Sequence, residues 1–147
     1  MSTEAVTLSL GPGTRLEGRS RTITDAEIAF LPALMGAVSP LFHDEVTAKA
    51  GPMGGRILYG PALLGISIAL TEHILHDRVL GLMEITSVRF RRPVRPGDTV
   101  HAALIVRSLV PREGKAGLVL SVDDEVTNQD GELVLRFARQ ILLAEEH

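Results

Sequence analysis

Residues 60–70 read GPALLGISIAL, and this segment decides the fold. Proline suits the first turn of a helix, so the Gly60-Pro61 step predicts that a helix begins here. From Ala62 to Leu70 the residues are apolar on every face of such a helix. A helix of this kind has to be buried, and we expect a long central helix that other elements enclose.

Polar residues follow only toward the end of this helix, at Glu72, His73 and His76. The two histidines are three positions apart, which would permit a shared metal ligand if a third group came close. We interpret them instead as residues of a helix end that reaches solvent, where cationic histidine is favourable. We therefore expect no metal site.

The segments around the helix alternate between apolar and polar residues, as half-buried strands do. A loose first strand is expected at 14–22, and clearer ones at 88–91, 100–107, 118–123 and 133–143. A turn at Asp130-Gly131 joins the last two as a hairpin. About five antiparallel strands with one buried helix predict an α+β architecture, a sheet wrapped around the central helix.

Two further features precede the central helix. Thr24 and Glu27 have the spacing of a capping box, which predicts a helix that ends near Gly36 and contains Pro32. Residues 37–56 are rich in proline, glycine and polar residues, and we expect at most one short helical turn there, starting around Asp44. Long irregular segments of this kind often carry functional sites.

Composition limits the classes of function. The 147 residues fit one domain, and a net charge of -3 with 3% aromatic residues argues against nucleic acid as a partner. No apolar run is long enough to span a membrane, and the N-terminus does not look like a secretion signal, so we expect a cytoplasmic protein without membrane contact. The absence of cysteine excludes disulfides, a thiolate nucleophile and cysteine-ligated zinc.

Two motifs carry a resemblance to a known family. Residues 39–44 read SPLFHD, with Ala48 after them, and residues 54–60 read GGRILYG. Residues 90–100 read FRRPVRPGDTV. In order and spacing these segments resemble the signatures of the MaoC-like hydratase/dehydratase family, over nearly the whole chain. The resemblance implies a single MaoC-like hot-dog domain over residues 1–147 that acts on an acyl thioester of the enoyl-CoA or 3-hydroxyacyl-CoA type.

The chain departs from the family pattern where the family has its catalytic pair. Ala37 stands at the position of the catalytic Asp, Phe42 at that of the catalytic His, and Tyr59 at that of a second motif histidine. Neither alanine nor phenylalanine can transfer a proton. Adding water to an enoyl thioester requires proton transfer and a hydrogen-bond donor for the thioester carbonyl, so the usual carriers of the first role are missing.

Other parts of the family's site are present. Backbone amides at Gly60 and Ala62 resemble the thioester carbonyl site at the start of the central helix. Gly55 and Arg56 lie in a loop that allows close backbone approach to the acyl group. A basic cluster is formed by Arg89, Arg91, Arg92 and Arg95. Arg91 and Arg92 could bind a phosphate of coenzyme A or a carrier protein, although the interpretation as solvent-facing strand arginines is favoured.

Three residues are candidates for the missing catalytic roles. His43 could act as the base with Asp44 orienting its ring, or His43 could be exposed while Asp44 caps the next helical turn. Tyr59 could donate a hydrogen bond to the substrate, or its ring could pack beside Phe42 in the acyl pocket. The sequence leaves these alternatives open.

Three functions follow from the resemblance. The first is a divergent hydratase or dehydratase, a lyase that needs no cofactor because coenzyme A or an acyl carrier belongs to the substrate. The second is a non-catalytic acyl-binding subunit beside a catalytic MaoC-like subunit, similar to mycobacterial-type dehydratases in which one half lacks the pair. The third is a repurposed tailoring enzyme. A thioesterase is disfavoured because residues 62–71 contain no carboxylate. In each case we expect a homodimer or a heterodimer.

Overall fold

The computed structural model describes residues 10–75 and 77–145, which build one antiparallel sheet and the helices beside it. The strands are β1 (Arg15–Thr22), β2 (Val79–Phe90), β3 (Thr99–Pro111), β4 (Leu118–Thr127) and β5 (Leu133–Leu143). Their order in the sheet is β1-β3-β4-β5-β2, and every neighbouring pair is antiparallel. This order leaves β1 and β2 as the edge strands.

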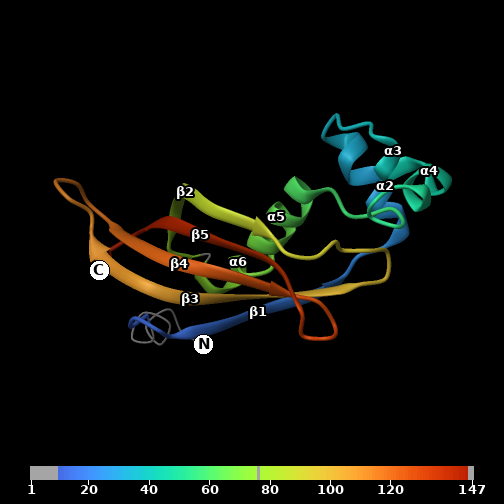
Figure 1. Ribbon diagram of the computed structural model, residues 1–147. Helices are drawn as coiled ribbons and strands as arrows, with labels where there is room; N and C mark the ends of the chain where they lie inside the picture. Colours follow the sequence, from blue (N-terminus) through green and yellow to red (C-terminus); the bar gives the residue numbers. More distant parts are fainter. Residues whose placement is uncertain (1–9, 76, 146–147) are drawn as a thin grey trace.

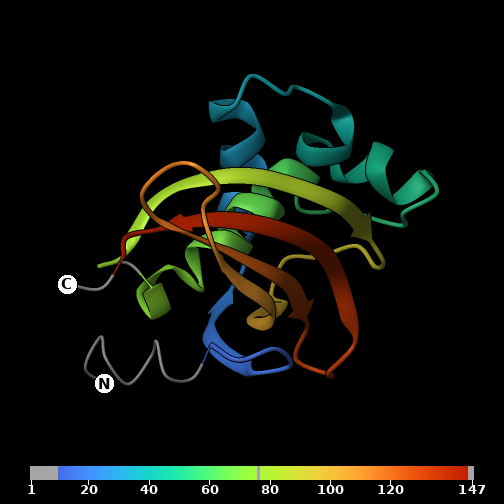
Figure 2. The same ribbon diagram turned by 90° about the vertical axis from the view of Figure 1, so that its left-hand side faces the viewer.

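The helices form two groups (Figure 1). They are α2 (Asp25–Leu34), α3 (Pro40–His43), α4 (Glu45–Ala50), α5 (Gly60–Ala69) and α6 (Glu72–Leu75). Helices α2, α3 and α4 stand together beyond one end of the sheet, and we call this group the overhang. Figure 2 shows that the sheet curves around α5. The α+β hot-dog fold, an antiparallel sheet around a central helix, is confirmed.

The overhang follows local signals in the sequence. The predicted capping box of α2 is present, with the Glu27 amide 3.2 Å from Thr24 Oγ1 and the Thr24 amide 3.1 Å from Glu27 Oε2. The expectation of at most one helical turn in 37–56 is wrong, because α3 precedes α4. Ser39 caps α3 and Pro40 occupies its first turn, a combination that favours a helix start.

Helix α5 is buried on one side only, which corrects the expectation of a fully enclosed helix. Leu63 and Ile66 face the sheet, whereas Pro61, Gly65 and Ala69 are exposed on the opposite side. The curved sheet covers one face of the helix, and small residues line the other. None of the helices in the described ranges is long and apolar enough to cross a membrane.

The buried side of α5 belongs to the main core. This core joins residues of α5 and of the loop before it to the concave face of the sheet; its largest fully buried members include Phe137, Leu135, Val126, Val100, Ile23 and Ile28. Full burial of one such side chain contributes about 1.5–3 kcal/mol. The core therefore fixes where α5 lies relative to β3, β4 and β5.

Strand β1 crosses the C-terminal end of α5 at Gly18. The Arg19 amide donates to the Leu70 carbonyl oxygen over 2.9 Å. A Cβ atom on Gly18 would lie 2.6 Å from the carbonyl oxygen of Ala102 and 2.8 Å from that of Leu70. Because both contacts are with backbone, only glycine allows this approach, and it holds the end of α5 against the sheet.

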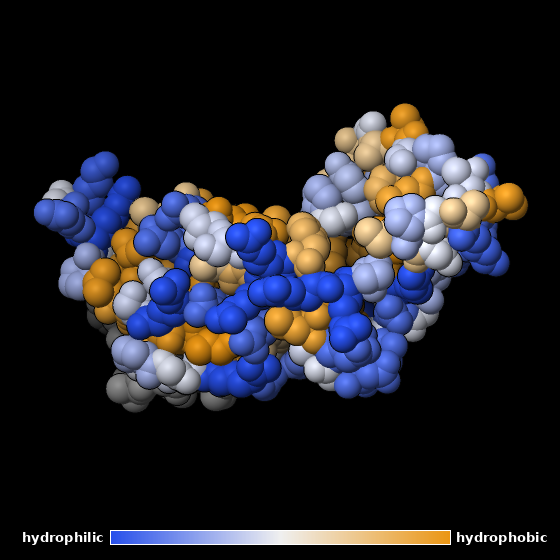
Figure 3. All heavy atoms as spheres, viewed as in Figure 1, coloured by the Kyte–Doolittle hydropathy of each residue, from blue (hydrophilic) through white to orange (hydrophobic). Residues whose placement is uncertain are grey.

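Edge strand β2 carries an exposed apolar surface. Figure 3 shows a saddle between the overhang and the tip of the β3–β4 hairpin, with hydrophobic residues along it, where Figure 1 places β2. Its exposed apolar side chains are Val79, Leu80, Leu82, Met83 and Phe90. An unpaired edge strand with such residues is a site for strand pairing.

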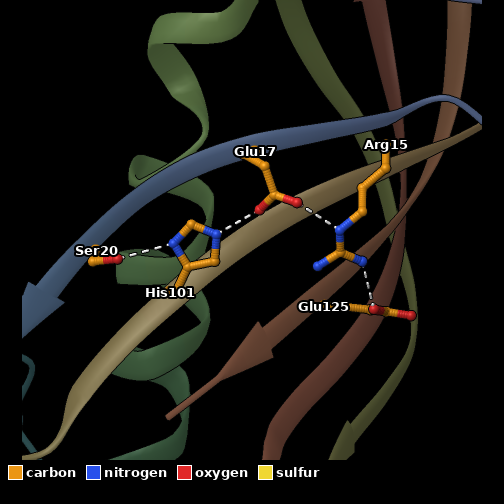
Figure 4. Close-up of polar contacts among 5 residues, drawn as sticks. All are labelled: Arg15, Glu17, Ser20, His101 and Glu125. Carbon is orange, nitrogen blue, oxygen red and sulfur yellow. Dashed lines mark hydrogen bonds and ion pairs between the residues drawn. The ribbon is translucent and has the colours of Figure 1, made fainter. Parts of the chain in front are cut away.

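Polar side chains on the outer face tie β1 to β3 and β4 (Figure 4). His101 Nε2 is 2.6 Å from Glu17 Oε2, and its Nδ1 is 2.9 Å from Ser20 Oγ. Arg15 bridges Glu17 and Glu125 at 2.7 and 3.0 Å. Hydrogen bonds from His101 and then Arg15 lower the pKa of Glu17. These contacts span the bulge in β1 between Glu17 and Ser20.

A buried ion pair joins β4 and β5 on the concave face. Arg139 donates from Nε and Nη2 to the two oxygens of Asp124, over 2.9 and 2.8 Å, and from Nη2 to Thr71 Oγ1 over 3.0 Å. The side chains of Arg139 and Asp124 are 6% and 1% exposed. Burial raises the pKa of Asp124, and the hydrogen bonds from Arg139 oppose this shift. The pair thus links the sheet to the residue just beyond α5.

Asp124→Asn should strongly destabilise the fold. The substitution keeps the shape of the side chain but leaves Arg139 as an uncompensated buried charge, which costs about 3–5 kcal/mol. Asp123→Asn is the matched control, because Asp123 lies on the outer face, with its Oδ1 3.7 Å from Arg107 Nη1. This substitution should lower the free energy of unfolding by less than about 1 kcal/mol. Urea unfolding followed by circular dichroism measures both, and equal costs would contradict this role of Asp124.

Candidate functional site

The N-terminal end of α5, here called the helix tip, has no capping side chain. The first intrahelical bond runs from the Leu63 amide to the Tyr59 carbonyl oxygen over 3.0 Å, and Pro61 has no amide hydrogen. The amides of Gly60 and Ala62 have no hydrogen-bond partner among the described residues. Unpaired amides at the positive end of a helix dipole are donors for a carbonyl oxygen or an anion.

An apolar cavity of about 210 Å³ adjoins the helix tip. It is lined by Met53, Ile57, Leu58, Gly60, Leu63, Phe90, Arg91, Arg92, Pro93 and Val94. The Phe90 ring lies across the tip, since a Cβ atom on Gly60 would be 3.1 Å from its Cζ. Glycine therefore leaves room between the ring and the first amide of the helix, and the cavity has the apolar lining that an acyl group requires.

The predicted basic cluster is divided between three places. Arg91 and Arg92 line the helix-tip cavity, and Arg92 also pairs with Glu132 at 3.0 Å. Arg89 lines a different hollow together with Arg136. Arg95 donates from its side chain to the Met53 carbonyl oxygen. The structure thus brings two of the four arginines to the helix tip.

Arg56 and Gly55 hold the overhang in place. Arg56 donates from Nε to Glu45 Oε2 over 2.5 Å and from Nη2 to Asp25, which ties α4 and α2 to the loop before α5. The hydrogen bond to Glu45 is the main cause that raises the pKa of Arg56. Gly55 is buried. A role of either residue in substrate binding stays a prediction, because the contacts seen here are structural.

Phe42 and Tyr59 pack against each other where the family pattern has histidines. Phe42 is buried, and its ring centroid is 5.2 Å from that of Tyr59 in an edge-on arrangement. Tyr59 is the residue before the first turn of α5, and its hydroxyl has no hydrogen-bond partner among the described residues. Of the two alternatives for Tyr59, the packing of its ring beside Phe42 is present. A hydrogen bond from its hydroxyl to a substrate stays a prediction.

His43 and Asp44 do not form a pair. His43 ends α3, is exposed, and meets Phe42 edge-on at a centroid distance of 6.5 Å. Asp44 caps α4, accepting from the Thr47 amide at 3.1 Å and from Thr47 Oγ1 at 2.7 Å. These bonds, first that of the hydroxyl, lower the pKa of Asp44. Asp44 is therefore bonded to Thr47 instead of orienting His43, and catalysis by either residue stays a prediction.

Ala37 and Phe42, which the sequence pattern aligns with the family's catalytic pair, have no group that can transfer a proton; the alignment itself stays a prediction. Ala37 lies just beyond α2, where its amide donates to the Pro32 carbonyl oxygen over 2.7 Å.

His76 lies outside the described residues, so its predicted place at a helix end is untested. Within the described ranges no group of three His, Asp or Glu side chains could hold a metal ion.

Ser20, His101 and Glu17 form a hydrogen-bonded row that resembles a nucleophile, base and acid. The row lies on the open outer face of β1 and β3 (Figure 4), and none of its members lines the helix-tip cavity. A nucleophile also needs a pocket with preorganised donors for an oxyanion, whereas these three side chains are exposed or half-buried on a face of the sheet. We assign this row to structure.

Several residues of the helix-tip cavity were not predicted from the sequence. Phe90 is the clearest example, since it alternates with Arg89 and Arg91 and its side of β2 could be read as inward-facing. The buried pair of Asp124 and Arg139 was also missed. The alternation of each strand could have revealed the pair. Asp124 lies on the same face of β4 as Val122 and Val126, and Arg139 on the same face of β5 as Phe137 and Ile141.

The sequence of this chain is similar to a known domain family and to two of its relatives. Residues 9–129 match the family model for the MaoC like domain. The chain is 29% identical over 125 residues to 3-hydroxybutyryl-CoA dehydratase of Methylorubrum extorquens, covering 82% of this chain and 76% of that protein. It is 29% identical over 93 residues to Protein MaoC of Klebsiella aerogenes, covering 63% of this chain but only 28% of that much longer protein.

A solved structure extends the similarity to three dimensions. The crystal structure of a monoamine oxidase regulatory protein from Archaeoglobus fulgius superposes with a TM-score of 0.86 at 30% identity, covering 95% of this chain and 94% of that one. The family match covers both motifs and the central helix between them. The chain therefore belongs to the MaoC-like domain family.

Proposed function

We propose that this protein binds an acyl thioester at the helix tip and acts as a hydratase/dehydratase on a substrate of the enoyl-CoA or 3-hydroxyacyl-CoA type. One observation carries the proposal: the uncapped first turn of α5 adjoins an apolar cavity of about 210 Å³ through Gly60, which lines it. Amides at that position would donate hydrogen bonds to the thioester carbonyl oxygen, while the cavity would hold the acyl chain.

The helix tip would serve the chemistry by stabilising negative charge. Hydration adds the hydroxyl of water to the β-carbon and a proton to the α-carbon, and negative charge builds on the thioester oxygen before that proton arrives. Two amide donors fixed in the backbone stabilise this oxygen without reorganisation. The positive end of the α5 dipole acts in the same direction.

In this proposal His43 transfers the proton and Tyr59 donates a hydrogen bond. Tyr59 adjoins the tip and has a free hydroxyl, so it would donate a hydrogen bond to the substrate or to water. His43 is the histidine of α3 and reaches the edge of Phe42, which packs on Tyr59. In this proposal His43 removes a proton from water and the same proton is delivered to the α-carbon.

Arg91 and Arg92 would bind the carrier. Both side chains are exposed and line the cavity at the helix tip. Arginine binds phosphate through several donors in a fixed plane, so these residues suit a coenzyme A or carrier-protein phosphate outside the acyl cavity. Coenzyme A is thus part of the substrate in this proposal, and no separate cofactor is assigned.

Gly60→Ala should weaken binding of butyryl-CoA, a saturated thioester that cannot be hydrated. The added Cβ lies 3.1 Å from the Phe90 ring and crowds the amide that would hold the carbonyl; we expect a loss of about ten-fold, the equivalent of one hydrogen bond. Gly65→Ala is the control, because its Cβ meets nothing within 4 Å. Isothermal titration calorimetry measures both, and unchanged affinity for Gly60→Ala would contradict the helix-tip site.

His43→Ala should remove the hydration of enoyl-CoA substrates. Loss of a general base lowers the rate by about 10²–10⁴-fold, while butyryl-CoA affinity should be kept because His43 does not line the cavity. His73→Ala, at an exposed histidine of α6, should retain activity. The assay follows loss of the enoyl absorbance over a series of chain lengths, and a wild-type protein without turnover on any of them would contradict the hydratase function.

A second candidate function is a non-catalytic acyl-binding subunit. Phe42 favours it, because this aromatic residue is buried at the family's histidine position and packs on Tyr59. His43 is exposed and Asp44 is bonded to Thr47, so no Asp/His pair faces the tip in the described part of the chain. Retained butyryl-CoA binding together with absent turnover is the result that this candidate requires.

We also propose that β2 pairs with the β2 strand of a second copy. The strand has 12 residues and pairs with β5 along one edge, which leaves its other edge open. Its exposed apolar side chains would be covered by antiparallel pairing with the partner. A catalytic MaoC-like subunit would occupy the same edge if the protein were the non-catalytic half of a heterodimer.

Met83→Asp should convert a dimer into a monomer. Met83 lies on the open strand and is 45% exposed, so the new charge would face its own copy across the interface. Val110→Asp is the control, since Val110 is 48% exposed but lies on β3. Light scattering after size exclusion measures the mass, and a monomeric wild-type protein at micromolar concentration would contradict the homodimer.

A further inference from the structure

A second cavity lies beyond the C-terminal end of α5. Its volume is about 140 Å³, and it is lined by Ile68, Thr71, Glu72, Leu75, Val79, Leu82, Leu104, Arg139 and Ile141. An α-helix rises 1.5 Å per residue, so the ten residues of α5 place this cavity roughly 15 Å from the helix tip. The two cavities share no lining residue.

Arg139, which lines this cavity, has one side-chain nitrogen outside its hydrogen bonds to Asp124 and Thr71. Its Nε and Nη2 bond to Asp124 and Thr71, whereas Nη1 has no hydrogen-bond partner among the described residues. Yet no fully buried side-chain nitrogen or oxygen in the described ranges lacks a partner. Nη1 must therefore reach accessible space, although the side chain as a whole is only 6% exposed. We infer that this space is the cavity, because Arg139 is one of the residues that line it.

The charges around the cavity determine which kind of ligand could receive a hydrogen bond from Nη1. Asp124 neutralises Arg139 through two hydrogen bonds, and Glu72 adds a negative charge at the rim. A carboxylate or phosphate ligand would lose its hydration without meeting a net positive charge, and an ammonium group would face the guanidinium. An uncharged acceptor meets neither penalty and gains a charge-assisted hydrogen bond.

The lining and the volume define the rest of the ligand. Leu75, Leu82, Leu104 and Ile141 make most of the surface apolar. A volume of 140 Å³ is close to the apolar cavity of about 150 Å³ that holds benzene, so the ligand has about six non-hydrogen atoms. We propose that this cavity is a second binding site, for a small aliphatic ketone, ester or amide whose carbonyl oxygen accepts a hydrogen bond from Arg139 Nη1. The site is independent of the proposed thioester chemistry.

The proposal is tested with 2-pentanone as the probe. Titration into the isotope-labelled wild-type protein should shift the NMR signals of the Thr71 amide and the Arg139 Nε–Hε group. Cyclopentane has the same carbon number without an acceptor and should bind about ten-fold more weakly, as loss of one hydrogen bond to a charged group implies. Pentanoate and pentylammonium should bind at least as weakly as cyclopentane.

Two pairs of variants locate the site. Ile68→Trp fills the cavity and should abolish the shifts, whereas Leu64→Trp, one turn earlier and equally half-buried, should leave them unchanged. If Ile68→Trp fails to fold, Ile68→Phe replaces it, with Leu64→Phe as its control. Equal affinity for cyclopentane would overturn the proposal. So would loss of the shifts in Leu64→Trp or Leu64→Phe, or shifts confined to other residues. None of these measurements involves a thioester.

Discussion

The structure depends on a helix that is held at one end and open at the other. At its C-terminal end α5 is held by the Arg19 amide on Leu70, by the close crossing of Gly18, and by Thr71, which accepts from Arg139. At its N-terminal end no side chain caps the first turn. A helix end without a cap retains unpaired amides at a stability cost, and the core around Leu63 and Ile66 offsets that cost.

The two ends of α5 differ in electrostatics as well as in packing. The tip offers backbone donors and a positive dipole end beside exposed Arg91 and Arg92, which favours an oxygen that gains negative charge. The opposite end has a buried guanidinium already neutralised by Asp124, which favours an uncharged acceptor. In the two proposals, the cavities at the opposite ends of α5 therefore bind ligands of different chemistry.

Several residues that the sequence singled out as site candidates make structural contacts. Phe42 is buried and meets Tyr59 edge-on, an arrangement that is worth about 0.5–1.5 kcal/mol beyond the burial of the rings. Asp44 is used as a helix cap and Arg56 as a tie between α2 and α4. These contacts hold α2 and α4 against the loop before α5.

The sequence by itself determined the kinds and order of the elements, because helix caps, proline positions and apolar alternation are local properties of the chain. The central helix, the capping box of α2 and strands β3, β4 and β5 were predictable in this way, and so was the helix tip at Gly60. The prediction for β2 was wrong in extent, because only residues 88–91 were expected as strand and the structure has Val79–Phe90. Only the tertiary structure decided which side chains meet. It separated Arg89 and Arg95 from Arg91 and Arg92, bonded Asp44 to Thr47, and joined Asp124 to Arg139. Such contacts depend on the register between strands and on the path of the irregular segment across the molecule, and both are set by packing of residues far apart in the chain.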